Sequence, residues 1–299
     1  MSAKSEEHKF DKLGPIKTLE FTNCVSQLRR FWALLPHKEL WFRGEGQYYS
    51  ETLLRPELYR PVSGRGLLPV WKLLEIENEL YEDFQRNAVD LSAERHEGED
   101  WDWDSYFLMQ HHNGPTRLVD WSDGSLIALH FALRNKRTDT GCACVYVLES
   151  YRFAEKLKSL PDAKQAEKDW KDFCGRHPSY GQKEHAWEDI YLPLDSEDAK
   201  EISIPRPPLV LEFPHITRRI AAQRSRFVVF GTDPDFLRQE LLGIDPSIRL
   251  IEIAEDACEE IRHELRDTGV IESVIYPDLD GLGREIRQTW DYRRSKETG

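Results

Sequence analysis

The side chains best suited to chemistry are concentrated between residues 108 and 135 of this chain. They lie directly ahead of an apolar run that begins at Leu126. Buried without partners, such polar groups would cost roughly 1–3 kcal/mol each, and more when charged. They must therefore satisfy one another or face a ligand. These side chains are Gln110, His111, His112, Thr116, Arg117, Asp120 and Trp121.

The elements that must position these groups are a turn, a short strand and a buried helix. Residues 113–115, Asn-Gly-Pro, favour a turn, and residues 116–121 are expected to be extended. Ser122 or Asp123 is a candidate N-cap. Residues 125–133 are apolar nearly all round, which is typical of a buried helix. The N-terminus of that helix is electropositive and would favour an anion nearby.

Five blocks along the chain together resemble the FRG domain family, which takes its name from a Phe-Arg-Gly sequence. Here that sequence is Phe42, Arg43 and Gly44. Glu45 stands where the family usually has Gln, and Asn113 stands where Gly is usual. Asn is compatible with the same backbone conformation. The five blocks span residues 41–44, 54–60, 110–133, 219–230 and 276–282.

The resemblance implies an α+β fold similar to the ADP-ribosyltransferase group, with a central, mostly antiparallel sheet flanked by helices. We expect a loose polar segment at 1–18 and a single domain at 19–299, with a charged, helical surface insertion at about 151–208. Predicted strands span residues 39–43, 116–121, 142–149, 209–213, 226–231, 249–253 and 272–276. Predicted helices span residues 20–35, 70–88, 125–133, 256–267 and 280–292, with one more ending near residue 110.

In that group a residue at the end of the first strand grips a dinucleotide, so the resemblance implies an NAD-dependent ADP-ribosyltransferase or NAD glycohydrolase. Arg43 would bind the pyrophosphate or the nicotinamide amide, and Gly44 would let the ligand approach the backbone. Gln110 and His111 would position the ribose. The expected catalytic residues are Arg43, Gln110, His111 and Asp120, and the expected ligand-binding residues are Arg43, Gly44, Thr116, Arg117 and Gln223.

Two alternatives stay open at this point. Arg117 and Asp120 could form a buried ion pair that holds the loop, in which case neither would contact a ligand. The catalytic carboxylate is also unassigned, with Glu45, Asp120 and Glu212 as candidates. A non-catalytic module that binds a nucleotide or an RNA end in the same cleft is therefore the second hypothesis. FRG-type proteins occur among toxins and phage-defence effectors, which extends the first hypothesis to such a role.

Bulk properties narrow the possible partners. A net charge of −13 argues against broad binding to nucleic acid, although residues 206–226 form a local basic segment. Five scattered cysteines provide no disulfide framework, and no apolar run is long enough to span a membrane, so a cytoplasmic location is expected. Cys142 and Cys144 are expected to be buried thiols, and Asp278 or Asp280 a helix cap, so we predict no metal site.

Overall fold

The computed structural model describes residues 18–34, 39–62, 65–88, 101–134, 136, 142–177, 186–211 and 217–297. The predicted loose segment therefore lies almost wholly outside the described residues, as does the candidate carboxylate Glu212. Among the helices within these ranges, none is long and apolar enough to cross a membrane.

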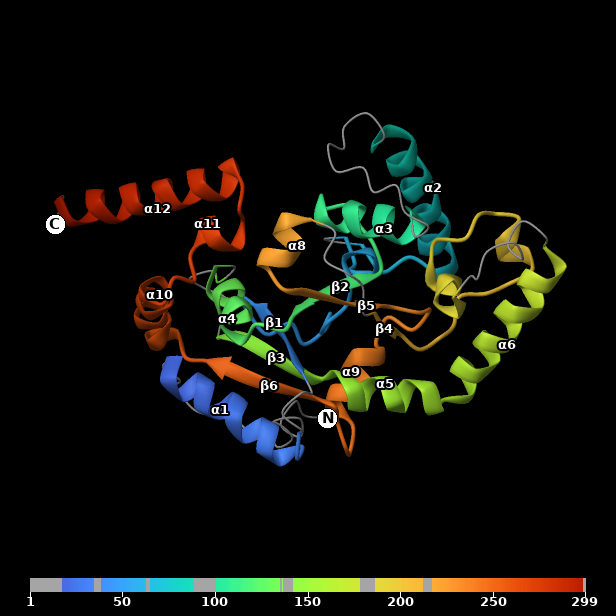
Figure 1. Cartoon of the computed structure of the whole chain (residues 1–299), viewed down its shortest axis with the longest axis horizontal. Coiled ribbons are helices and arrows are strands. Elements are labelled where there is room, and N and C mark those ends of the chain that lie inside the picture. Colours follow the sequence, from blue (N-terminus) through green and yellow to red (C-terminus); the bar gives the residue numbers. More distant parts are fainter. Residues whose placement is uncertain are drawn as a thin grey trace.

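The centre of the fold is a six-stranded sheet in the order β4-β5-β2-β1-β3-β6 (Figure 1). All five neighbouring pairs are antiparallel, which confirms the predicted sheet type. Adjacent residues of β1 point into different cores, since Trp41 packs on one face and Phe42 on the other. The strands are β1 (Leu40–Glu45), β2 (Leu118–Ser122), β3 (Ala143–Glu149), β4 (Leu209–Leu211), β5 (Ser225–Val229) and β6 (Ile248–Ile253).

Helices cover both faces of this sheet. The core under α1, α4 and α10 lies on one face, and the core under α5 and α9 lies on the other. A third core joins α2, α3 and α6 to β4 and β5. The α-helices are α1 (Thr18–Phe31), α2 (Val70–Ala88), α3 (Trp101–His111), α4 (Ser125–Arg134), α5 (Ser150–Ser159), α6 (Pro161–Arg176), α8 (Arg218–Ala222), α9 (Phe236–Leu242), α10 (Cys258–Asp267), α11 (Glu272–Ile275) and α12 (Leu279–Glu297). Short 3-10 helices span Glu57–Tyr59, Trp187–Tyr191, Asp198–Lys200 and Glu255–Ala257.

The segment expected as a surface insertion is part of the core. Its first part is the helix pair α5 and α6, as predicted. However, Phe153, Phe173 and Tyr191 are almost completely buried. Burying such large apolar side chains against the sheet is favourable. The described part of residues 151–208 therefore contributes side chains to the core, which the prediction of a surface insertion did not include.

Two local predictions also fail. Residues 272–276 were expected to form a strand, but α11 occupies this position. The buried Glu272 there bonds to arginines of two helices, and this tertiary contact overrides the strand propensity. Asp123 does not cap α4, because its carboxylate forms ion pairs with Arg224 and Arg226. At α12, Asp278 is the N-cap and accepts a bond from the amide of Gly281.

Candidate functional site

A cleft opens where β1 and β2 separate. Phe42 and Ser122 are the only paired residues along these two described strands, whereas β1 pairs with β3 along its whole length. Two adjoining cavities of about 200 and 280 Å³ lie at this opening. Both are lined by Arg43, Asn113, Asp120, Arg219, Gln223 and Ser225.

Arg43 is held in the gap between the two strands. Its Nε donates to Glu45 Oε1 at 3.0 Å, and its Nη1 donates to the carbonyl oxygen of Asp120 at 2.8 Å. Burial alone would lower the pKa of Arg43, but the charges of Glu45 and Asp120 raise it above its ordinary value. The guanidinium is therefore a fixed positive charge in the cleft wall. Glu45 is 6% exposed, pairs with this arginine and lines neither cavity.

Gly44 has a packing role in addition to the one expected from the sequence. The strand continues through it to Glu45 and does not end at Arg43. A Cβ atom on Gly44 would lie 1.8 Å from the carbonyl oxygen of Ala128 and 2.5 Å from the amide nitrogen of Ala132. Both atoms belong to the backbone of α4. The close approach of α4 to β1 therefore requires glycine at this position. Gly44 also lines the larger cavity, so the expected approach of a ligand stays a prediction.

Asp120 faces the cleft from the middle of β2. Its carboxylate accepts a bond of 2.8 Å from Gln110 Nε2. Loss of surrounding water raises the pKa of Asp120, and Arg43 and Gln110 oppose this shift. Asp120 is exposed, whereas Glu45 is buried, so of these two candidates Asp120 is the one that can reach a ligand.

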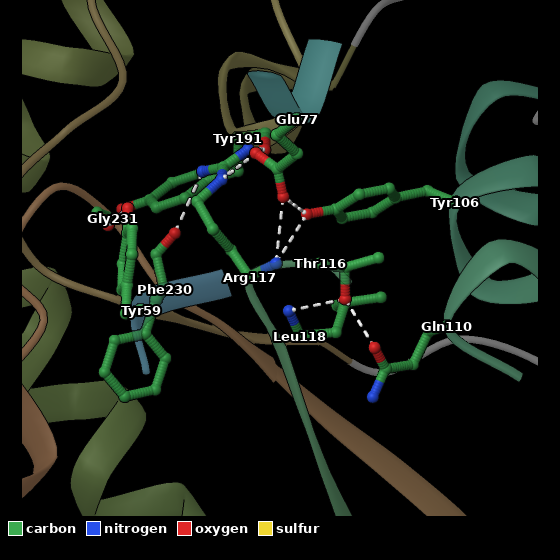
Figure 2. A network of polar contacts seen from close by, with 10 residues as sticks. All are labelled: Tyr59, Glu77, Tyr106, Gln110, Thr116, Arg117, Leu118, Tyr191, Phe230 and Gly231. Carbon is green, nitrogen blue, oxygen red and sulfur yellow. Dashed lines mark hydrogen bonds and ion pairs between the residues drawn. The ribbon is translucent and has the colours of Figure 1, made fainter. Parts of the chain in front are cut away.

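Thr116 positions Gln110 from inside the protein. The threonine is completely buried and lines neither cavity. Its hydroxyl donates to Gln110 Oε1 and accepts a bond of 3.1 Å from the amide of Leu118 (Figure 2). Because Thr116 has no exposed surface and lines neither cavity, it would act on a ligand only through Gln110, which differs from the predicted direct contact.

Arg117 also lies outside the cleft. Its guanidinium has no exposed surface, and it donates to Glu77 and to the carbonyl oxygens of Phe230 and Tyr191 (Figure 2). Burial would lower the pKa of Arg117, but Glu77 raises it well above its ordinary value. Neither the expected contact with a phosphate nor the alternative ion pair with Asp120 occurs. The partner is Glu77 on α2, which has no exposed surface either.

His111 lies at the end of α3 and lines the smaller cavity, next to the turn at Asn113. Asn113 has a φ of 64°, as the turn prediction requires. Burial lowers the pKa of His111 to about 4, helped by the charges of Arg219 and His112. The imidazole is therefore neutral at pH 7, and it offers one donor and one acceptor. His112 is exposed.

Arg219 is a cleft residue that the sequence did not single out. It comes from α8 and lines both cavities, and its guanidinium lies 4.5 Å from the ring centre of Tyr276. Its Nε is buried without a hydrogen-bond partner, and no ion pair within the described ranges includes it. Arg219 was visible only as one of several arginines in a basic segment. Nothing in the sequence distinguishes it from Arg218, which is exposed on the same short helix.

Gln223 and Tyr276 close the far side of the cleft. Gln223 follows α8 and lines both cavities, and its Nε2 donates to the carbonyl oxygen of Ile275 at 3.4 Å. Tyr276 lines the larger cavity, and Arg134 and Arg284 lie 4.8 and 4.6 Å from its ring centre. The two C-terminal sequence blocks thus meet the first three at one cleft.

Glu272 anchors this side of the cleft and makes the fold sensitive to acid. It accepts bonds of 2.7 Å from Arg134 and 3.0 Å from Arg284. Burial alone would raise its pKa, but bonds to His130 and Arg284 and the charge of Arg134 lower it to about 2. Stability from this group is complete above its unfolded pKa of 4.5 and is lost as pH falls from 4.5 toward 2.

We therefore expect the free energy of unfolding of the wild type to fall steeply as the pH is lowered from 4.5 toward 2, the unfolded and folded pKa values of this carboxyl. In the same pH range, the free energy of unfolding of Glu272→Gln should fall less steeply. Urea titrations followed by tryptophan fluorescence at several pH values would measure both slopes. Equal slopes for the two proteins would show that Glu272 does not carry this pH dependence.

The described residues contain no group of three or more His, Cys, Asp or Glu side chains arranged to hold a metal ion.

No curated protein and no solved structure matches the chain. Residues 38–141 match the family model of the FRG domain. This span includes Arg43, Gln110, His111 and Asp120, while Arg219 reaches the same cleft from outside it. The chain therefore contains an FRG domain at residues 38–141.

Proposed function

We propose that the cleft at Arg43 binds the phosphate groups of a nucleotide, and that NAD is its ligand. The observation that carries this proposal is the unpaired guanidinium of Arg219 beside the fixed charge of Arg43. Arg60 adds a third positive charge to the smaller cavity, and none of the ion pairs found in the described ranges includes it. Guanidinium groups bind phosphate through paired, directional hydrogen bonds. An anion would also relieve the repulsion between these arginines.

The remaining groups suit the other parts of a dinucleotide. Neutral His111 and the amide of Gln110 can exchange hydrogen bonds with ribose hydroxyls in the smaller cavity. The larger cavity is lined by the ring of Phe131, which suits a planar base or a nicotinamide ring. Tyr276 also lines this cavity, but arginine side chains already lie against its ring. The phosphates would then lie between the two cavities, against Arg43 and Arg219, which both cavities share.

Asp120 supplies the group needed for cleavage of NAD. Breaking the bond between ribose and nicotinamide leaves positive charge on the ribose carbon, and a nearby carboxylate stabilises that charge. Gln110 fixes one oxygen of Asp120. The proposed reaction transfers ADP-ribose to water or to another acceptor and releases nicotinamide. Consumption of cellular NAD in this way would account for a toxin or phage-defence role.

A non-catalytic module that binds a nucleotide or an RNA end is the second candidate. Glu45 is buried, so among the described candidates for the catalytic carboxylate only Asp120 is exposed. This shortage of carboxylates in the cleft favours the non-catalytic module. In a non-catalytic module, the role of the Asp120 carboxylate would be to orient the amide of Gln110, from which it accepts a bond. The two candidates share the ligand and differ in whether nicotinamide is released.

Removing the unpaired guanidinium should weaken binding of NAD. We expect Arg219→Gln to raise the Kd at least about tenfold, since a hydrogen bond to a charged group contributes about 1.5–3 kcal/mol. Calorimetric titration with NAD would measure this change. Arg218→Gln is the matched control, because Arg218 is the exposed neighbour on α8 and lines neither cavity. Absence of NAD binding to the wild type, or equal weakening in both variants, would refute the proposed ligand site.

Replacing the cleft carboxylate should separate binding from cleavage. We expect Asp120→Asn to bind NAD while losing most of its nicotinamide release, because the neutral amide cannot stabilise the positive ribose carbon. Chromatographic quantification of free nicotinamide after incubation with NAD would measure the rate. If the wild type binds NAD and releases no nicotinamide even at high protein concentration, the non-catalytic candidate replaces the enzyme.

A further inference from the structure

A second hollow of about 450 Å³ lies between α4, α10, α11 and α12. Ligand pockets in proteins usually have volumes of about 300–1,000 Å³. This hollow adjoins the nucleotide cleft at Arg134, which lines both. It contains none of the groups assigned above to the nucleotide, so it is a separate site.

The lining of this hollow combines an apolar floor with a positively charged rim. The floor consists of Leu133, Leu265, Val270 and Ile271, together with the ring of Tyr292. The charged side chains of the lining are four cations and two carboxylates, and three further polar residues complete it. The cations are Arg134, Lys136, Arg262 and Arg266, the carboxylates are Glu259 and Glu272, and the remaining residues are His130, His263 and Gln288. A positive balance at this place contrasts with the net charge of −13 of the whole chain.

Arg266 is the charge that a ligand can use. Arg134 is paired with Glu272, and Arg262 is paired with Glu259. Lys136 lies 3.7 Å from Glu255. Arg266, near the end of α10, is exposed, and the ion pairs of the described chain do not include it. The half-buried side chains of Val270 and Ile271 follow it in the sequence, so a free charge and accessible apolar surface lie in one hollow.

We propose that this hollow binds a small amphipathic anion. Its apolar body would cover the floor, where removal of apolar surface from water stabilises the complex by roughly 25 cal/mol per Å². Its carboxylate, phosphate or sulfonate would pair with Arg266. A cationic amphiphile would meet the same rim with repulsion, and an uncharged one would gain nothing from it. This inference does not depend on NAD being the ligand of the cleft.

The test uses the intact chain and the fluorescent probe anilinonaphthalene sulfonate, which has an aromatic body and one negative charge. We expect saturable binding that decanoate displaces and decyltrimethylammonium does not. Arg266→Glu should raise the Kd of the probe about tenfold, which corresponds to 1.4 kcal/mol. Gln288→Glu, which adds a negative charge on the α12 side of the hollow, should weaken binding in the same direction. Both side chains are exposed, so both variants should fold.

Two controls separate this hollow from other surfaces. Ile286→Gln changes an exposed apolar row on the outer side of α12, formed by Leu279, Leu282, Ile286 and Trp290. Arg219→Gln changes the nucleotide cleft. Both should leave probe binding unchanged. The proposal is overturned if binding is not saturable, if the cationic amphiphile competes as well as decanoate, or if Ile286→Gln weakens binding as much as Arg266→Glu.

Discussion

Arg117→Ala is expected to lower the free energy of unfolding by about 3–5 kcal/mol, the usual cost of removing one partner from a buried ion pair. The carboxylate of Glu77 would remain in the interior without its guanidinium, and two carbonyl oxygens would lose their donor. Urea unfolding followed by tryptophan fluorescence would measure the change. We expect the folded fraction of the variant to bind NAD, because Arg117 does not line the cleft.

A double-mutant cycle would show whether the pair accounts for this loss. Glu77→Gln and Arg117→Met should each destabilise the protein, and the combined variant should lose less than the sum of the two, by about 0.5–3 kcal/mol. Tyr106 lies between the two partners, since its hydroxyl donates to Glu77 and accepts a bond of 3.0 Å from the Arg117 amide. If instead Arg117→Ala is as stable as the wild type and fails to bind NAD, Arg117 contacts the ligand and the structural role assigned here is wrong.

Several strands could be predicted because their sequences are short and largely apolar. β3, with all of its residues buried, illustrates this, since an apolar sequence of that length favours a central strand. The same rule failed at residues 272–276. There a shorter run with three apolar residues forms α11, in which Glu272 bonds to Arg134 and Arg284 from two other helices. Local pattern has no information about such distant partners.

Only part of the cleft could be predicted, because local sequence does not show which distant residues meet. Arg43 was identified from the resemblance to the FRG family and from its place at an expected strand end, and Asp120 from the dense polar stretch that contains it. Both line the cleft. Arg117 has the same residue type as Arg43, yet its partner Glu77 lies 40 positions away on α2, and no spacing rule connects Arg117 with Glu77. Arg219 was missed because its exposure and lack of a partner are properties of the fold. Sequence identified the chemistry available, and tertiary contacts decided which groups remain free.

Gly44→Ala is expected to lower the free energy of unfolding by at least about 3 kcal/mol, the upper end of the usual cost of forcing extra atoms into a packed site. The new methyl group would lie 1.8 Å from the carbonyl oxygen of Ala128. This oxygen belongs to the backbone of α4, so no side-chain rotation can relieve the overlap. The helix must move away from β1 or the strand must shift, and either change disturbs Arg43 next to it. Urea unfolding and NAD titration would measure the two effects.

Gly66→Ala is the matched control for this prediction. No atom lies within 4 Å of a Cβ built on Gly66, and its φ is not in the left-handed region. Alanine there should leave stability unchanged or raise it by about 0.4–1 kcal/mol, because it restricts the unfolded chain. The two hypotheses for Gly44 predict different results. If glycine is needed for packing of α4, Gly44→Ala loses stability first. If it is needed for approach of the ligand, the variant keeps the stability of the wild type and loses only NAD binding, which would restore the role first expected from the sequence.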